Sequence, residues 1–156
     1  MNSYLAGVLL ILVGGYALDL IEEIMTEDTP RRRRKDDEPP LVLARHGWRY
    51  HHLGIPTTVP RLGERYIESL KIHVSGFDTS PYGIEWMRFD ADCPISDLVK
   101  TVPHIAFEVD DLDAALEGKE VLSPPGSPSE GVRAAMIVHN GAPIELIEFC
   151  KKNRKD

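Results

Sequence analysis

Residues 52–57 read HLGIPT and residues 104–109 read HIAFEV, so one pattern occurs twice in this chain of 156 residues. In both copies a histidine is followed by an aliphatic residue, a small residue and another apolar residue. A second pattern also recurs, because IEWMRF at residues 84–89 matches IELIEF at residues 144–149. Two patterns that repeat in the same order predict that the second half of the domain is a structural copy of the first.

The repeated segments predict strands that each present one histidine to a shared face. Successive strand residues point to opposite faces of a sheet, so His104 lies on the same face as Ala106 while the apolar residues between and after them face the core. The same alternation places His52 with Gly54 and puts the neighbouring His51 on the other face. The small residue two positions after each histidine leaves room beside the imidazole.

Four side chains are expected to converge where the two halves meet. Each half contributes one histidine and one glutamate near the start of a strand, and a pseudo-twofold axis would bring together His52, Glu85, His104 and Glu145. Two neutral imidazoles and two carboxylates suit one divalent cation such as Zn, Ni, Co, Mn or Fe. Glu108, on the same expected face as His104, is an alternative ligand or a residue that supports one.

The rest of the domain alternates short apolar runs with turn residues. Strands are expected at residues 50–57, 71–77, 83–89, 103–109, 120–124, 132–138 and 143–150, and helices at residues 60–70 and 111–119. Asp110 or Asp111 is the expected N-cap of the second helix. Asn140 and Gly141 predict a tight hairpin between the last two strands.

These residues resemble the vicinal oxygen chelate superfamily, which includes glyoxalase I, methylmalonyl-CoA epimerase, extradiol dioxygenases and bleomycin-resistance proteins. The resemblance covers about residues 50–149, and it is carried by HHLGIPTTVP, VPHIAFEVDDLDAAL and GAPIELIEF. It implies an α+β fold in which two βαβββ modules form a curved mixed sheet around a metal-centred cavity. It also implies metal ligands at the four positions that the repeat indicates.

The resemblance implies a function as well. Four protein ligands are typical of glyoxalase-type lyases and isomerases, in which the metal holds adjacent oxygens of a small substrate and stabilises an enediolate. By this resemblance Glu145 is the base that removes and returns the proton, with Glu85 as the symmetric alternative. Two alternatives stay open: a metal-free ligand-binding protein of the bleomycin-resistance type, and a ring-cleaving dioxygenase that holds iron with two histidines and one carboxylate.

The two halves differ in length. His52 and Glu85 are 33 positions apart, whereas His104 and Glu145 are 41 apart. A deficit of this size is about one strand with its turn. The first module is therefore expected to be shortened by a strand, which either reduces one wall of the cavity or leaves that wall for a partner subunit to complete. Because members of the superfamily often form dimers, we expect a homodimer.

Composition narrows the partners and the compartment. The formal net charge of -7 gives no indication of the basic surface that nucleic-acid binding requires, so nucleic acid is not an expected partner. Cys93 and Cys150 have no metal-like spacing and are expected to be free thiols in a reducing compartment, the cytoplasm.

The N-terminal third has a different composition from the domain. The predicted organisation has an apolar segment, a polar linker rich in Arg and Pro, the domain and a basic tail: residues 1–25, 26–47, 48–150 and 151–156. Residues 2–18 carry no charge and are slightly short for a membrane span. A membrane anchor, a helix lying on a membrane surface and a plain extension are therefore all open for this segment. If it inserts, the basic run at residues 31–35 keeps the domain in the cytoplasm.

Overall fold

The computed structural model describes residues 35–150. The predicted apolar segment at residues 1–25, most of the basic run and the basic tail lie outside the described residues. No helix within residues 35–150 combines the length and the apolar character that a membrane crossing requires. The chain divides into two units, residues 1–38 and residues 39–156, and all the strands described below belong to the second unit.

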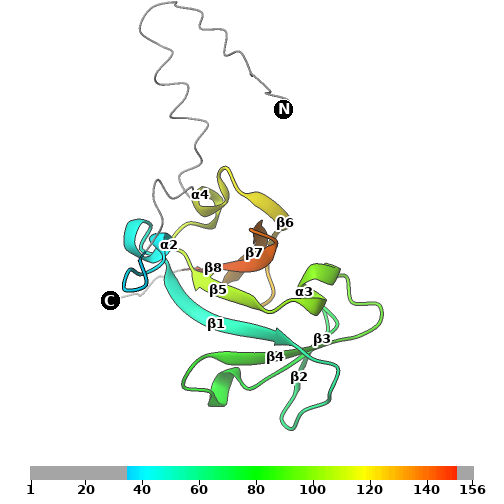
Figure 1. The fold of residues 1–156 in the computed structure, drawn as a ribbon. Helices are drawn as coiled ribbons and strands as arrows, with labels where there is room; N and C mark the ends of the chain where they lie inside the picture. The colour runs from blue at the N-terminus through cyan, green and yellow to red at the C-terminus, as the bar shows by residue number, and fades with distance from the viewer. Residues whose placement is uncertain (1–34, 151–156) are drawn as a thin grey trace, which may run out of the picture. The chain divides into compact units, whose positions relative to one another are not determined.

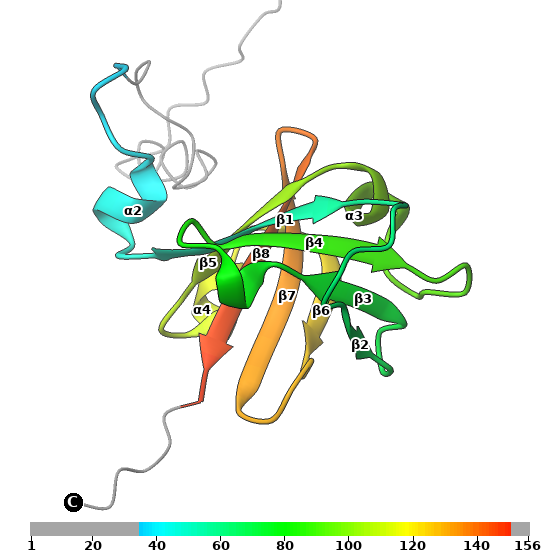
Figure 2. The ribbon, with the colours of Figure 1, turned by 90° about the horizontal axis from the view of Figure 1, so that it is seen from below.

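A single mixed sheet forms the framework of the second unit (Figure 1). Its strands are β1 (Arg49–Pro56), β2 (Arg65–Ile67), β3 (Ile72–Ser75), β4 (Ile84–Phe89), β5 (His104–Glu108), β6 (Glu120–Gly126), β7 (Val132–His139) and β8 (Ala142–Phe149). The helical segments are α2 (Leu41–Arg45), the 3-10 turn η1 (Phe77–Thr79), α3 (Asp97–Thr101) and α4 (Leu112–Leu116). The sheet twists so strongly that β1 and β4 run across the direction of β7 and β8 (Figure 2).

The strand order shows that the sheet consists of two matching halves. The order is β2-β3-β4-β1-β5-β8-β7-β6, so each half has its first strand at the centre and its second strand at the edge. In each half the first strand lies parallel to the fourth, and the two halves meet at the antiparallel pair β1 and β5. This topology confirms the internal repeat and the expected fold class of two related modules in a curved mixed sheet.

Two features read from local patterns are confirmed in the second half. Asn140 and Gly141 both have positive φ angles, 51° and 75°, as the two central residues of a type I′ hairpin turn require. Asp111 caps α4, because its side chain accepts a hydrogen bond from the backbone N–H of Ala114 at 3.0 Å. The turn joins β7 to β8 and thereby helps to set the register of β8.

The first half is shortened, but the prediction that it has lost a strand is wrong. It has four strands, as the second half does, but β2 and β3 have three and four residues where β6 and β7 have seven and eight. The helix predicted for residues 60–70 is also absent: residues 57–64 form a loop, all of it within the described chain, and β2 follows. Gly63 in this loop adopts a left-handed φ of 78°, which ends any helix, and Leu62 is fully exposed.

The loop that replaces the helix covers the outer face of β4 with charged groups. Glu64 accepts two hydrogen bonds from the guanidinium of Arg88, at 3.1 and 2.6 Å, and this pairing lowers the pKa of Glu64 to about 2. The guanidinium of Arg61 lies 4.2 Å from the ring centroid of Trp86. The matching face of β8 packs against α4 instead. The first half thus uses ion pairs and a cation–π contact where the second uses a helix.

The apolar core has a separate cluster in each half. The cluster of the second half contains Phe107, Val109, Leu112, Ala135, Ile137 and Leu146, and that of the first half contains Ile72, Val74, Met87 and Cys93. Partly buried side chains of α2 pack against the cluster of the second half, although α2 lies in the segment predicted to be a linker. Cys93 is buried and Cys150 is exposed, and both are free, as expected.

Replacing Leu146 with alanine tests the core of the second half. Leu146 has no exposed surface, so Leu146→Ala is expected to lower the free energy of unfolding by about 2–5 kcal/mol. The matched control is Leu62→Ala on the exposed loop, which should change it by less than about 0.5 kcal/mol. Urea denaturation measures both. Equal effects of the two substitutions would contradict the packing described for β8.

Candidate metal centre

The antiparallel pairing of β1 with β5 places each histidine opposite a small residue. His52 lies opposite Ala106, and Gly54 lies opposite His104, so the pairing is symmetric about the centre of the two strands. A side chain built on Gly54 would collide with the imidazole, because its Cβ would lie 2.0 Å from Cε1 of His104. At Gly54 the structure confirms that a small residue makes room for an imidazole, which is that of His104 on the opposite strand.

Strands β4 and β8 flank the β1–β5 pair, which we call the seam, and each of them adds one carboxylate beside it. On β8, Glu145 is the register partner of Ala106, and on β4, Glu85 is the register partner of Gly54. Each glutamate therefore lies beside a small residue of the neighbouring strand, and a histidine lies on the other side of that small residue, in the next strand. The side chains of both glutamates can reach over the small residue because it fills little space above the sheet.

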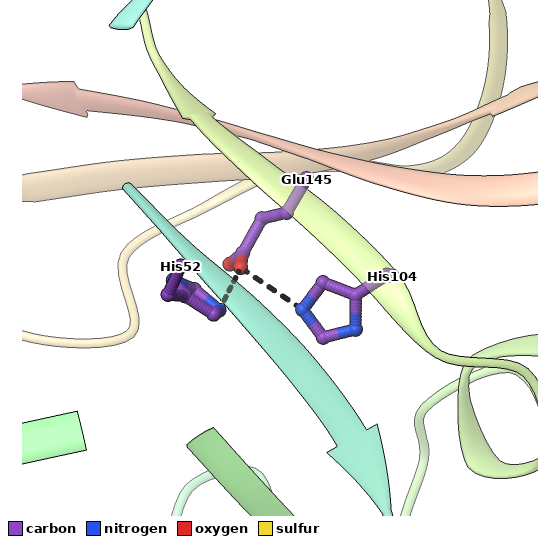
Figure 3. Close-up of side chains that lie close together, drawn as sticks. All are labelled: His52, His104 and Glu145. Atoms are coloured by element: carbon purple, nitrogen blue, oxygen red, sulfur yellow. Dashed lines mark ion pairs between the residues drawn. The ribbon is translucent and has the colours of Figure 1, made fainter. Parts of the chain in front are cut away.

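Three of the four predicted ligands form one tight group. Ligand atoms of His52, His104 and Glu145 all lie within 4.8 Å of one another. Oε2 of Glu145 is 3.3 Å from Nε2 of His52 and 3.4 Å from Nε2 of His104. Figure 3 shows this carboxylate directed toward both imidazoles, which come from the two central strands.

The two histidines carry buried nitrogen atoms that suit a cation. His52 and His104 are 5% and 1% exposed. Within the described part of the chain, Nε2 of His52 and both ring nitrogens of His104 are buried without a hydrogen-bond partner. Burying polar atoms without partners is unfavourable, and a divalent metal ion held by two imidazoles and a carboxylate removes that cost. The three residues therefore fit a divalent metal by their chemistry and by their position.

Glu85 lies beside this group and does not belong to it. Its Oε2 is 3.6 Å from Nε2 of His52. Burial raises the pKa of Glu85, and the negative charge of Glu145 raises it further, while the nearby His52 opposes the shift. The two glutamates that occupy matching positions in the repeat thus have different environments.

Glu145 and His52 stabilise each other's charged forms. Burial by itself would raise the pKa of Glu145, but the imidazoles of His104 and His52 outweigh this effect and lower it to about 2. Burial would lower the pKa of His52, but the adjacent Glu145 outweighs it and the pKa is raised. In the absence of a metal, the site therefore favours an ionised glutamate next to a histidine that binds a proton readily.

Glu108, the alternative ligand, has a different role in the structure. Its carboxylate accepts a hydrogen bond from Arg49 at 2.9 Å, and the same Arg49 nitrogen donates to Asp110 at 2.7 Å. Glu108 is not part of the group of three that could hold a metal. It ties the start of β1 to the end of β5, next to the seam that carries the histidines.

His51 does not lie on the opposite face, so that prediction is wrong. The register of β1 against β5 shifts between Tyr50 and His52, which makes His51 the extra residue of a β-bulge. The bulge breaks the simple alternation, and Nδ1 of His51 lies 2.8 Å from Nδ1 of His52. Strand alternation fails here because a bulge depends on the partner strand, and the sequence of β1 contains no sign of it.

Two aromatic side chains near the site were not predicted from the sequence. Phe77 of η1 stacks on His51 with ring centroids 5.1 Å apart, and its ring is nearly perpendicular to that of His52, with the two centroids 5.9 Å apart. Phe149 lies 5.5 Å from His51. Phe149 follows Glu145 by four positions on one strand, so alternation could have placed both on the same face. Phe77 comes from a turn, for which the sequence offers no comparable signal.

Comparison with known proteins adds information about the fold. No protein-family model matches the chain, and no curated protein matches it. Its structure is similar to that of a hypothetical protein of Bacillus halodurans, with a TM-score of 0.51 and 18% identity over 70% of this chain and 98% of that chain. It is also similar to methylmalonyl-CoA epimerase of Mycobacterium tuberculosis, with a TM-score of 0.46 and 22% identity over 64% of this chain and 86% of that chain.

The fold expected from the resemblance is confirmed. Two matching four-stranded halves join in one curled sheet, and the candidate metal site lies where they meet. The similarity to the Bacillus halodurans protein spans nearly all of that chain and indicates that the whole domain shares one architecture. This architecture, two four-stranded modules curled around a candidate metal site, is like that of the vicinal oxygen chelate fold.

Substituting Gly54 tests whether the seam needs a residue without a side chain. Gly54→Ala should displace the His104 ring and lower the free energy of unfolding by about 1–3 kcal/mol, because the new methyl group overlaps the imidazole. Gly126→Ala on β6 is the matched control, since a Cβ there meets no atom within 4 Å. Chemical denaturation measures stability, and the NMR shifts of the His104 ring report its position. Unchanged His104 shifts in Gly54→Ala would contradict this packing.

The pH dependence of stability tests the coupling of Glu145 to His52 in the metal-free protein. The lowered pKa of Glu145 stabilises the folded protein at pH values above 4.5, the ordinary pKa of a glutamate. This contribution is lost as the pH falls toward 2. A raised His52 pKa stabilises the fold below the ordinary value of 6.5, and this contribution is lost as the pH rises through the folded-state pKa. Glu145→Gln should therefore weaken both dependences in denaturation curves measured with a chelator present. Glu108→Gln should leave the dependence above pH 6.5 intact.

Proposed function

We propose that this protein is a divalent-metal-dependent enzyme of the glyoxalase type, a lyase or isomerase that acts on a small substrate with adjacent oxygen atoms. The observation that carries this proposal is the group of His52, His104 and Glu145, with a second carboxylate, that of Glu85, next to it. A group of three protein ligands leaves coordination positions for substrate oxygens. The second carboxylate supplies an acid–base group within the same site.

The residues of the site divide into ligands and a proton carrier. His52, His104 and Glu145 would hold the metal, which when bound acts as a Lewis acid on the oxygens of the substrate. Glu85 would take a proton from the carbon beside the substrate carbonyl and then return it to carbon, which gives the product. Its raised pKa suits this role, because a carboxyl group that binds a proton more readily is a better base and can release the proton later. Glu145 has the opposite shift and is better suited to remain ionised on a cation.

A ring-cleaving dioxygenase is the second candidate. Two histidines and one carboxylate form the ligand set with which many non-haem enzymes hold iron(II), and the group in this structure has that composition. The two candidates differ in their need for Glu85. Proton transfer at carbon requires a base in this position, whereas the iron ligand set is complete without it.

The other expectations about partners also stay proposals. We propose that the protein forms a homodimer and works in the cytoplasm on a small molecule. The free state of both cysteines agrees with a reducing compartment. The net charge of -7 argues against nucleic acid as a partner.

Metal analysis tests the first part of the proposal. The full chain, incubated separately with Zn²⁺, Ni²⁺, Co²⁺, Mn²⁺ or Fe²⁺ and then freed of excess metal, should retain one ion per chain with at least one of these metals. Glu145→Gln should lower the affinity by at least about tenfold, because a charged ligand is lost, while the matched control Glu108→Gln should not. If the wild-type chain retains no ion with any of Zn, Ni, Co, Mn or Fe, the enzyme proposal fails and a metal-free ligand-binding protein becomes the better hypothesis.

Isotope exchange tests the role of Glu85. In D₂O the metal-loaded protein should exchange the C–H hydrogen of small 2-hydroxy ketones or of the methylglyoxal–glutathione adduct, as measured by NMR. Glu85→Gln should retain the metal but lose at least about a hundredfold in exchange rate, as expected for removal of a general base. Oxygen consumption with iron(II) and a catechol, unaffected by Glu85→Gln, would instead favour the dioxygenase.

A further inference from the structure

The contact between His51 and His52 has the geometry of a well-aligned hydrogen bond. The two Nδ1 atoms are 2.8 Å apart, and the ring centroids are 5.1 Å apart. Two imidazoles have this centroid separation when their Nδ1 atoms point straight at each other along the line between the ring centres. One of the two nitrogens must therefore carry a hydrogen and the other must accept it.

The direction of this hydrogen bond decides whether His52 can bind a metal. Nε2 of His52 faces Glu145 and is the ring nitrogen that lies in the group of three. A metal needs the lone pair of Nε2, so a neutral His52 ligand must carry its hydrogen on Nδ1 and donate it to His51. If His51 donated instead, the hydrogen of His52 would lie on Nε2 and would block the metal.

His51 is itself held in place by aromatic contacts. Its ring stacks on Phe77 with an interplanar angle of 14° and packs against Phe149. The β-bulge supplies the backbone position, because it interrupts the alternation that would otherwise turn adjacent side chains to opposite faces of the sheet. His51 is only partly buried, so a hydrogen on its Nε2 can be hydrated while Nδ1 accepts.

We infer that His51 is a positioning residue: its Nδ1 accepts the Nδ1–H of His52, which fixes the ring orientation and tautomer that direct Nε2 of His52 to the metal. This inference rests on the proposed metal site. Partners of this kind commonly change metal affinity by about ten- to a hundredfold. His51 makes no contact with the metal or the substrate in this role.

Two substitutions separate the acceptor from the aromatic ring. His51→Phe keeps a ring to stack on Phe77 but has no acceptor, whereas His51→Asn places its Oδ1 at the position of Nδ1 but removes the ring. Competition titrations with Co²⁺ should show affinity lowered about ten- to a hundredfold in His51→Phe and within about threefold of wild type in His51→Asn. The opposite order, or equal losses in both variants, would show that His51 acts through packing and would overturn the inference.

NMR of the ring nitrogens distinguishes failure of this inference from failure of the metal site. In the metal-free wild-type protein at neutral pH, ¹⁵N shifts should show Nδ1 of His52 protonated and Nδ1 of His51 unprotonated. A proton on Nδ1 of His51 would overturn the inference whether or not the protein binds metal. Failure of the wild-type chain to bind Co²⁺, with the expected ¹⁵N pattern, would refute the proposed function but leave the direction of the hydrogen bond established.

Discussion

The pairing of β1 with β5 is the constraint on which the rest of the structure depends. This pair joins the two halves of the sheet and sets His52 against Ala106 and His104 against Gly54. A slip of one residue would turn every side chain of one strand to the other face and would remove a histidine from the site. Because Gly54 lies in contact with the His104 ring, the register is also fixed by the shape of the two side chains.

The symmetry of the seam does not extend to the chemistry of its two carboxylates. Glu145 lies between both imidazoles and is strongly favoured as an anion, whereas Glu85 approaches only His52 among them and binds a proton more readily. A site in which environments shift two carboxyl groups in opposite directions can assign one to holding charge and the other to moving a proton. The structural repeat supplies two similar groups, and small differences in distance give them different properties.

The two halves differ most at their outer surfaces. Strands β1 and β5 hold matching central positions in the sheet, but α4 covers one outer face and an ion-paired loop covers the other. A helix must bury an apolar stripe to stay attached, whereas the pair of Glu64 and Arg88 needs only a short loop. The first half can therefore be shorter without losing a strand, and the seam that carries the site is unaffected.

The sequence by itself determined the internal repeat and the shared face of His52, His104 and Glu145. Alternation and matching positions were enough to place His52, His104 and Glu145 together, and Asn140 with Gly141 was enough to predict the last hairpin, because these signals are local. Only the tertiary structure decided that Leu62 and its neighbours form a loop, that Glu85 lies outside the group of three and that a bulge turns His51 toward His52. Each of these depends on a partner strand or on distances across the sheet, and no local pattern in the chain encodes such contacts.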